Sequence, residues 1–122
     1  STTMEERRTY RRLAEHAAES EKALERYLVE RVKACGGECL KYYAASATGW
    51  PDRIVLMPGG VTAWVELKSK GKRPTPLQRT RLERLREMYF MADVADSRED
   101  IDTLVELLEA ESRRLTGKEA EA

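Results

Sequence analysis

The chain has 122 residues, of which 36% are charged and 41% hydrophobic, and its acidic and basic side chains balance to a formal net charge of zero. This length suits one domain with a single core. No stretch of about 18 apolar residues is present, which excludes a transmembrane helix, and the chain does not open with the segments of a secretory signal.

The first predicted element is a long helix. Residues 4–35 contain neither Pro nor Gly, are rich in Glu, Arg, Ala and Leu, and are followed by Gly36-Gly37, which ends a helix readily. The apolar stripe is clear only in the second half. We treat residues 1–19 as an N-terminal helical extension, which is a separate helix, an arm that binds a partner, or a frayed end.

Cysteine usage favours a reducing compartment. Cys35 and Cys39 are the only cysteines and His16 is the only histidine, so these residue types cannot complete a four-ligand zinc site. We interpret both cysteines as free thiols and expect a cytoplasmic protein.

Three strands are predicted after the glycines, at residues 40–44, 53–57 and 61–68, each with β-branched or aromatic residues and bounded by turn signals. Pro58-Gly59-Gly60 is a tight turn, so the second and third strands should pair as a hairpin. A loop with two prolines follows at residues 69–76.

The last predicted elements are a helix at 77–89, a short strand at 91–96 and a helix capped by Ser97. In the first of these helices we expect a buried face of five residues: Leu77, Leu82, Leu85, Met88 and Tyr89. Residues 112–122 should form a loose polar tail. The order α-β-β-β-α-β-α predicts the α/β class, and more narrowly an α+β arrangement in which helices flank a mixed sheet.

Charge is unevenly distributed although the totals balance. Between Lys68 and Arg86 lie eight basic residues and one acidic residue, Glu83, whereas acidic residues dominate from Asp93 to Glu111. A local basic surface of this kind is what binding to a phosphate backbone requires.

One polar pattern carries chemistry. Pro51-Asp52 is followed by Glu66-Leu67-Lys68, in the form P-D-(x)n-E-x-K. Side chains alternate along a strand, so Glu66 and Lys68 should share a face. Asp52 and Glu66 each lie seven residues from Gly59, so the hairpin should bring their carboxylates together.

Two carboxylates held close together repel each other unless a cation lies between them. We expect Mg²⁺ or Mn²⁺ to bind Asp52, Glu66 and the backbone carbonyl of Leu67. Lys68 would then orient the attacking water or stabilise charge on the phosphate, as phosphodiester hydrolysis requires. The plainer alternative is a solvated Asp after a turn and a Glu–Lys pair on an edge strand.

These residues also carry a family resemblance. Residues 25–37, 40–41, 49–53, 65–68 and 74–78 resemble the PD-(D/E)XK nuclease superfamily, and specifically the VRR-NUC domains of the small stand-alone phage or bacterial type. The resemblance implies a restriction-endonuclease-like core at residues 20–111, a divalent metal ion, a DNA substrate, and action in the cytoplasm of the phage's host or of the bacterium.

The resemblance also implies further site residues. An acid on the first helix, Glu25 or its rival Glu21, should join the metal site, and Gln78 should contact the metal-bound water or a phosphate. We assign DNA binding to basic residues on both sides of the site: Lys41, Arg53, Lys70, Lys72, Arg73 and Arg79.

The function predicted from these residues and this resemblance is metal-dependent cleavage of DNA. The resemblance implies selectivity for branched DNA, as in a Holliday-junction resolvase, and a homodimer would place two cuts about a twofold axis. Two alternatives stay open, namely a restriction-type or flap-trimming nuclease and a DNA-binding module that does not cut.

Overall fold

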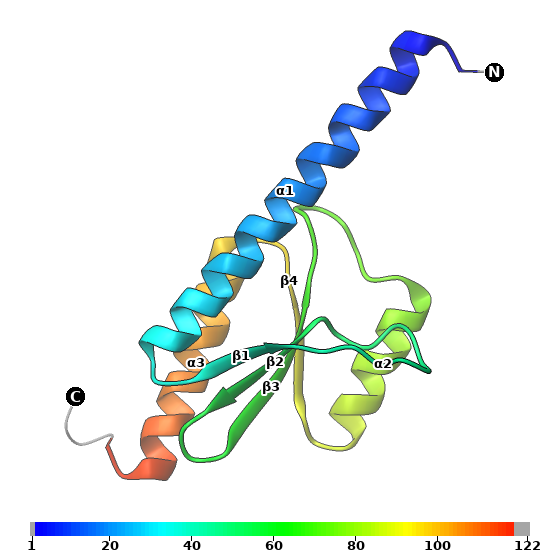
Figure 1. The fold of residues 1–122 in the computed structure, drawn as a ribbon. Helices are drawn as coiled ribbons and strands as arrows, with labels where there is room; N and C mark the ends of the chain where they lie inside the picture. The colour runs from blue at the N-terminus through cyan, green and yellow to red at the C-terminus, as the bar shows by residue number, and fades with distance from the viewer. Residues whose placement is uncertain (1, 119–122) are drawn as a thin grey trace.

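The computed structural model describes residues 2–118, which fold into three helices and four strands (Figure 1). They follow the predicted order: α1 (Met4–Ala34), β1 (Glu38–Lys41), β2 (Arg53–Met57), β3 (Val61–Leu67), α2 (Pro76–Glu87), β4 (Met91–Ala95) and α3 (Arg98–Thr116). The predicted α/β class and element order are confirmed. Of the predicted tail, residues 119–122 lie outside the described residues.

The sheet has the strand order β1-β2-β3-β4. The first three strands run antiparallel, whereas β4 is parallel to β3 because α2 crosses over between them. Arg53 pairs with Val65, and continuing that register by one residue places Asp52 opposite Glu66. The hairpin predicted from the turn at Gly59 therefore forms in the expected register.

The first strand lies earlier than predicted. β1 spans Glu38–Lys41, and its last residue pairs with Arg53, the first residue of β2. Beyond this point β2 offers no further partner, and only one more backbone bond forms, from Tyr42 N–H to the Asp52 carbonyl at 2.9 Å. The strand therefore ends before residues 43 and 44.

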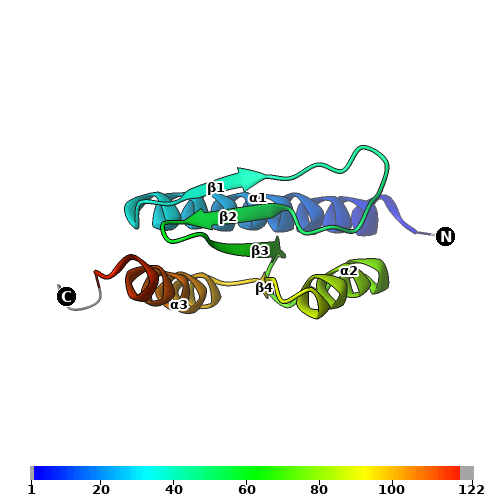
Figure 2. The same cartoon turned by 90° about the horizontal axis from the view of Figure 1, so that it is seen from below.

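Helices cover both faces of the sheet (Figure 2). α1 and α3 pack on one face, over a core that includes Leu28, Val55, Val65, Ile101 and Leu108. α2 covers part of the other face with a smaller cluster of Leu82, Leu85 and Ala92, against which Trp50 and Trp64 pack. The face of β3 that carries Trp64 is therefore the face that packs against α2.

α1 is one continuous helix of 31 residues, capped at its start by the Thr3 side chain, which accepts a hydrogen bond from Glu6 N–H. Its first half projects beyond the rest of the molecule as an extended arm (Figure 1). Leu24 is the first buried residue among the α1 side chains that the structure describes. The alternative of a separate N-terminal helix is therefore excluded.

Two features at the C-terminal half differ from the prediction. Leu77, Met88 and Tyr89 are exposed rather than buried, because α2 ends at Glu87 and meets the sheet only through its Leu82 and Leu85 side.

The second difference concerns α3, which continues to Thr116, past the predicted start of the tail. Ser112 is buried there and donates a hydrogen bond to the Pro58 carbonyl at 2.5 Å. No helix within residues 2–118 is long and apolar enough to cross a membrane.

Candidate active site

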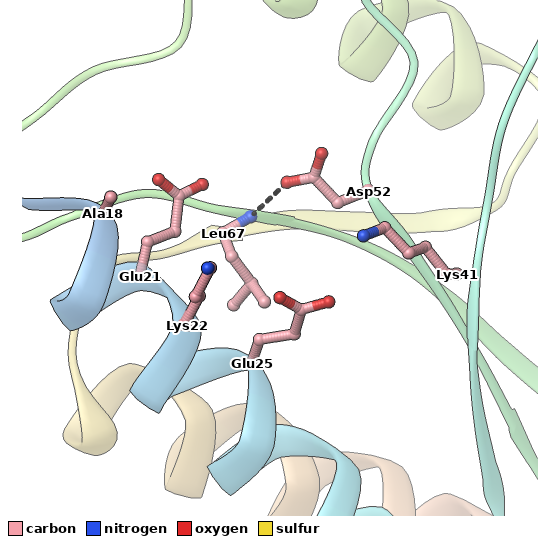
Figure 3. Close-up of a pocket in the computed structure, with 7 residues that line it drawn as sticks. All are labelled: Ala18, Glu21, Lys22, Glu25, Lys41, Asp52 and Leu67. Carbon is pink, nitrogen blue, oxygen red and sulfur yellow. Dashed lines mark hydrogen bonds between the residues drawn. The ribbon is translucent and has the colours of Figure 1, made fainter.

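A cavity of about 240 Å³ lies between α1 and the place where β2 begins and β3 ends (Figure 3). Five of its seven lining residues are charged, and the lining comes from four parts of the chain, namely α1, the end of β1, the residue before β2 and the end of β3. The lining residues are Ala18, Glu21, Lys22, Glu25, Lys41, Asp52 and Leu67. Of the predicted site residues, the structure thus gathers Glu25, Lys41, Asp52 and Leu67 around one cavity.

Asp52 lies in the loop just before β2, and its side chain is hydrogen-bonded to the neighbouring strand β3. It follows the buried Pro51, and its Oδ2 accepts a hydrogen bond from the backbone N–H of Leu67 at 3.3 Å. Burial raises the pKa of Asp52, and the bond from Leu67 opposes that rise. The carboxylate is therefore held in place at the cavity wall by backbone geometry.

Glu66 lies next to Asp52 and is only 2% exposed. Lys68 Nζ lies 3.7 Å from Glu66 Oε1, so the two side chains share a face as strand alternation requires. Glu66 Oε2 is buried and has no hydrogen-bond partner among the described residues. Burial, followed by the negative charge of Asp52, raises the pKa of Glu66 to about 7.

Two acids on α1 approach the same region. Glu21 and Glu25 lie one turn apart and both line the cavity. Glu25 forms an ion pair with Arg53, so its charge is compensated. The pKa of Glu21 is raised, first by burial and then by Asp52, while Lys68 and Lys72 oppose the rise. Glu25 is in turn one cause of the raised pKa of Asp52, so both α1 acids interact with Asp52, and they differ in that Glu25 is paired with a cation.

The predicted residues of the β3–α2 loop and of α2 lie outside the lining of the cavity. Gln78 forms a capping box with Thr75, in which the Gln78 Oε1 accepts from Thr75 N–H at 2.9 Å. The loop between β3 and α2 is anchored where Gly71 N–H donates to Asp96 Oδ2 at 3.1 Å. Four exposed basic residues lie on that loop and on α2: Lys70, Lys72, Arg73 and Arg79.

Two cavity residues were missed by the sequence analysis, Ala18 and Lys22. Both follow from helical spacing, because Lys22 lies three residues before Glu25 and Ala18 seven before it, on the same side of a helix. Lys22 and Lys41 add two positive charges to the three carboxylates of the cavity, Glu21, Glu25 and Asp52.

The loop that leads into Asp52 is clamped onto α2. The Arg81 guanidinium lies 4.9 Å from the centre of the Trp50 ring, and its Nε donates to the Thr48 carbonyl at 3.1 Å. Trp50 also packs near Trp64, with ring centroids 6.3 Å apart. These contacts fix the chain two residues before Asp52, which restricts where its carboxylate can lie.

The donor set fits a hard divalent cation. Among residues 2–118, no three acidic, imidazole or thiol side chains lie so that they could together hold a metal ion. Asp52 and Glu66 nevertheless present adjacent carboxylates, and the buried Glu66 Oε2 lacks a donor. A cation that accepts oxygen ligands would satisfy that oxygen and relieve the repulsion that raises the Glu66 pKa.

Known proteins resemble this chain over most of its length, although no family profile matches it. It is 35% identical over 79 residues to "Putative nuclease p44" of Acyrthosiphon pisum secondary endosymbiont phage 1. The matched region covers 65% of this chain and 85% of the phage protein. A solved structure described as a VRR_NUC domain has a TM-score of 0.68 and 33% identity, covering 71% of this chain and 95% of that one. A second, a VRR_NUC domain protein, reaches only 0.47 at 24% identity, over 63% and 68% of the two chains, and adds nothing to the assignment.

The mixed sheet, the acidic cavity at its end and these similarities together define a nuclease. More narrowly, the chain belongs to the VRR-NUC domain family.

Proposed function

We propose that this nuclease is a divalent-metal-dependent DNA endonuclease. The observation that carries the proposal is the buried Glu66 carboxylate, with one oxygen lacking a donor, beside Asp52 and 3.7 Å from Lys68 Nζ. A buried acid of this kind is stable as an anion only if something else neutralises it. Mg²⁺ or Mn²⁺ suits the oxygen donors present.

Asp52, Glu66 and the Leu67 carbonyl would hold the ion, together with one acid of α1. Glu21 is the better candidate for that acid than Glu25, because Glu25 is already paired with Arg53. When bound, such an ion stabilises negative charge on the phosphate and acidifies a coordinated water.

The chain's own residues supply the remaining roles. Lys68 would donate to the attacking water or to the phosphate, from a position set by Glu66. Gln78 keeps its side-chain NH₂ available for a phosphate or water, because the capping box uses only its Oε1.

We assign DNA backbone contacts to the basic loop and its surroundings: Lys41, Arg53, Lys70, Lys72, Arg73 and Arg79. All but Arg53, whose guanidinium pairs with Glu25, are exposed. Contacts of this kind bind phosphate without reading sequence.

Branched DNA is the substrate class we favour, since the chain is small and its basic residues suit the recognition of shape. A homodimer would set two such sites about a twofold axis, as paired cuts at a four-way junction require. A restriction-type or flap-trimming nuclease is the second candidate. The cytoplasmic location stays a prediction.

The test is cleavage of matched four-way-junction, flap and linear DNAs with Mg²⁺, with Mn²⁺ or with EDTA. We expect metal-dependent nicking of the junction that disappears in Lys68→Ala, while DNA binding by that variant persists. Light scattering would report the dimer. Protein that binds all three DNAs but never cuts with either metal would instead be a non-catalytic binding module.

A further inference from the structure

The projecting half of α1 carries a compact group of four arginines, Arg7, Arg8, Arg11 and Arg12, all of them exposed. None forms an ion pair with another residue of the described chain. Within residues 2–118, the side-chain hydrogen bonds of the group run from Arg7 to the backbone carbonyls of Thr2 at 3.2 Å and Thr3 at 3.4 Å. Four guanidinium groups in less than two turns thus lack acidic partners.

Two of these arginines share the side of α1 that lines the cavity. At about 3.6 residues per turn, the eleven residues from Arg7 to Ala18 and from Arg11 to Lys22 make about three turns. The eighteen residues from Arg7 to Glu25 make about five turns. Because α1 is continuous, Arg7 and Arg11 face the same direction as the cavity-lining residues.

Arg8 and Arg12 are each one position further along the helix, and are therefore turned by about 100° from that direction. The arm thus has two arginine pairs of equal charge and similar exposure, on different sides. Only the pair Arg7 and Arg11 continues the cavity face.

The spacing matches a nucleic acid that runs from the cavity along the arm. At about 1.5 Å per residue, Arg11 lies about 15 Å and Arg7 about 21 Å from Glu21 along the helix. At about 3.4 Å per base pair, these positions correspond to about 4–6 base pairs from a phosphate bound at the cavity. A guanidinium suits a phosphate because it offers several donors in one plane.

We propose that Arg7 and Arg11 form a phosphate-binding stripe that holds the DNA about 4–6 base pairs from the cut. This inference rests on the proposed nuclease function and extends it to a segment outside the site. The stripe adds affinity and a fixed direction for the DNA, and it touches no reacting atom.

Binding is tested in EDTA, so that no cutting occurs, by fluorescence anisotropy with a labelled 30-base-pair duplex over a range of salt concentrations. Arg7→Ala/Arg11→Ala should weaken binding about tenfold and lower the slope of log affinity against log salt by about 1–2. The matched control, Arg8→Ala/Arg12→Ala, should change the affinity less than about twofold.

Each other outcome overturns the proposal. Equal losses in both pairs would show a diffuse charge effect without direction, and no loss in either would remove the arm from binding. Light scattering on the same variants completes the test. If Arg7→Ala/Arg11→Ala changes the mass of the assembly while affinity per protomer is unchanged, the stripe is an interface between copies of the chain.

A second measurement separates this inference from the proposed function. Four-way junctions whose arms are trimmed toward the mapped cut should lose the affinity difference between wild type and Arg7→Ala/Arg11→Ala once fewer than about 4 base pairs remain on one side. Cutting of the untrimmed junction by wild-type protein with Mg²⁺ reports on the nuclease alone. Absence of cutting therefore counts against the proposed function, whereas an affinity difference that survives trimming counts against the stripe.

Discussion

The backbone N–H of Leu67 donates to Asp52 Oδ2 at 3.3 Å, which joins the start of β2 to the end of β3 at the wall of the acidic cavity. This bond couples the position of a site carboxylate to the strand register, since Asp52 lies opposite Glu66 by continuation of the Arg53–Val65 pair. Moving the strand by one residue would separate the two acids and expose the N–H.

Asp52→Asn should separate the structural role of this side chain from its chemical role. The amide oxygen of Asn can still accept from Leu67, so we expect an unfolding free energy within about 0.5 kcal/mol of wild type, but cleavage reduced at least about a hundredfold. Asp52→Ala loses the bond as well and should be about 1 kcal/mol less stable. Urea unfolding and single-turnover cleavage measure both. Equal stability of the two variants would contradict the role of the bond.

Glu66 should make stability depend on pH. Its folded pKa of about 7 exceeds the ordinary 4.5, so folding favours the protonated form. The contribution of Glu66 to the stability of the folded state is therefore fully present below about pH 4.5 and is lost as pH rises through about 7. The glutamine of Glu66→Gln cannot titrate. Between pH 5 and 8 the unfolding free energy of wild type should therefore fall by about 1–3 kcal/mol relative to that of the variant.

The measurement is urea unfolding of both proteins in EDTA at several pH values. Asp52, whose pKa is also raised, lowers stability with rising pH in both proteins, so the difference between the curves reports the titration of Glu66 together with its repulsion from Asp52. Adding Mg²⁺ at pH 8 should recover stability in wild type more than in Glu66→Gln. Parallel curves for the two proteins would show that Glu66 ionises as freely as in the unfolded chain.

Arg81 should matter more than its surface position on α2 suggests. Arg81→Ala removes the stacking on Trp50 and the bond to the Thr48 carbonyl, so we expect a loss of about 1–2 kcal/mol and slower cleavage with DNA affinity little changed. Arg84→Ala is the control, because the exposed Arg84 guanidinium pairs with Glu87 of the same helix, and the substitution should cost less than about 0.5 kcal/mol. Identical behaviour of the two variants in unfolding and cleavage would exclude the clamp.

Two glycines should respond differently to the same substitution. A Cβ at Gly37 would lie 2.6 Å from both the Leu56 carbonyl oxygen and the Met57 sulfur, so Gly37→Ala should cost about 2–3 kcal/mol through overpacking. Gly60 has open space but φ of +74°, so Gly60→Ala should cost only about 1 kcal/mol of backbone strain. Thermal unfolding of the two variants decides, and a larger loss at Gly60 would contradict the packing argument.

Much of the fold could be predicted from local patterns. Helical and strand periodicities are properties of neighbouring residues, so the order of elements followed from them. The pairing of Asp52 with Glu66 was also accessible, because one short turn at Gly59 lies equally far from both. Their common face with Lys68 required only strand alternation.

Other features depend on contacts between distant segments. The exposure of Leu77 and Tyr89 follows from how little of α2 meets the sheet, which its own sequence does not reveal. The same holds for Ser112, which is buried because Pro58, 54 residues away, accepts its hydrogen bond.

The two acids of α1 show most clearly which features the sequence predicts and which ones depend on the tertiary structure. Both Glu21 and Glu25 face the cavity by helical spacing, and the sequence favoured Glu25 through a family resemblance. The two acids differ in the structure because Arg53, 28 residues further along, pairs with Glu25, whereas both acids interact through charge with Asp52.

The residues along the chain thus set which elements form, in what order, and which side chains of the hairpin converge, since these depend on backbone periodicity and one tight turn. Packing of α1 against the sheet settled which carboxylates share a cavity, how deeply Glu66 is buried and how its pKa shifts. The reason is that burial and charge act through space, between groups that folding brings together from separate parts of the sequence.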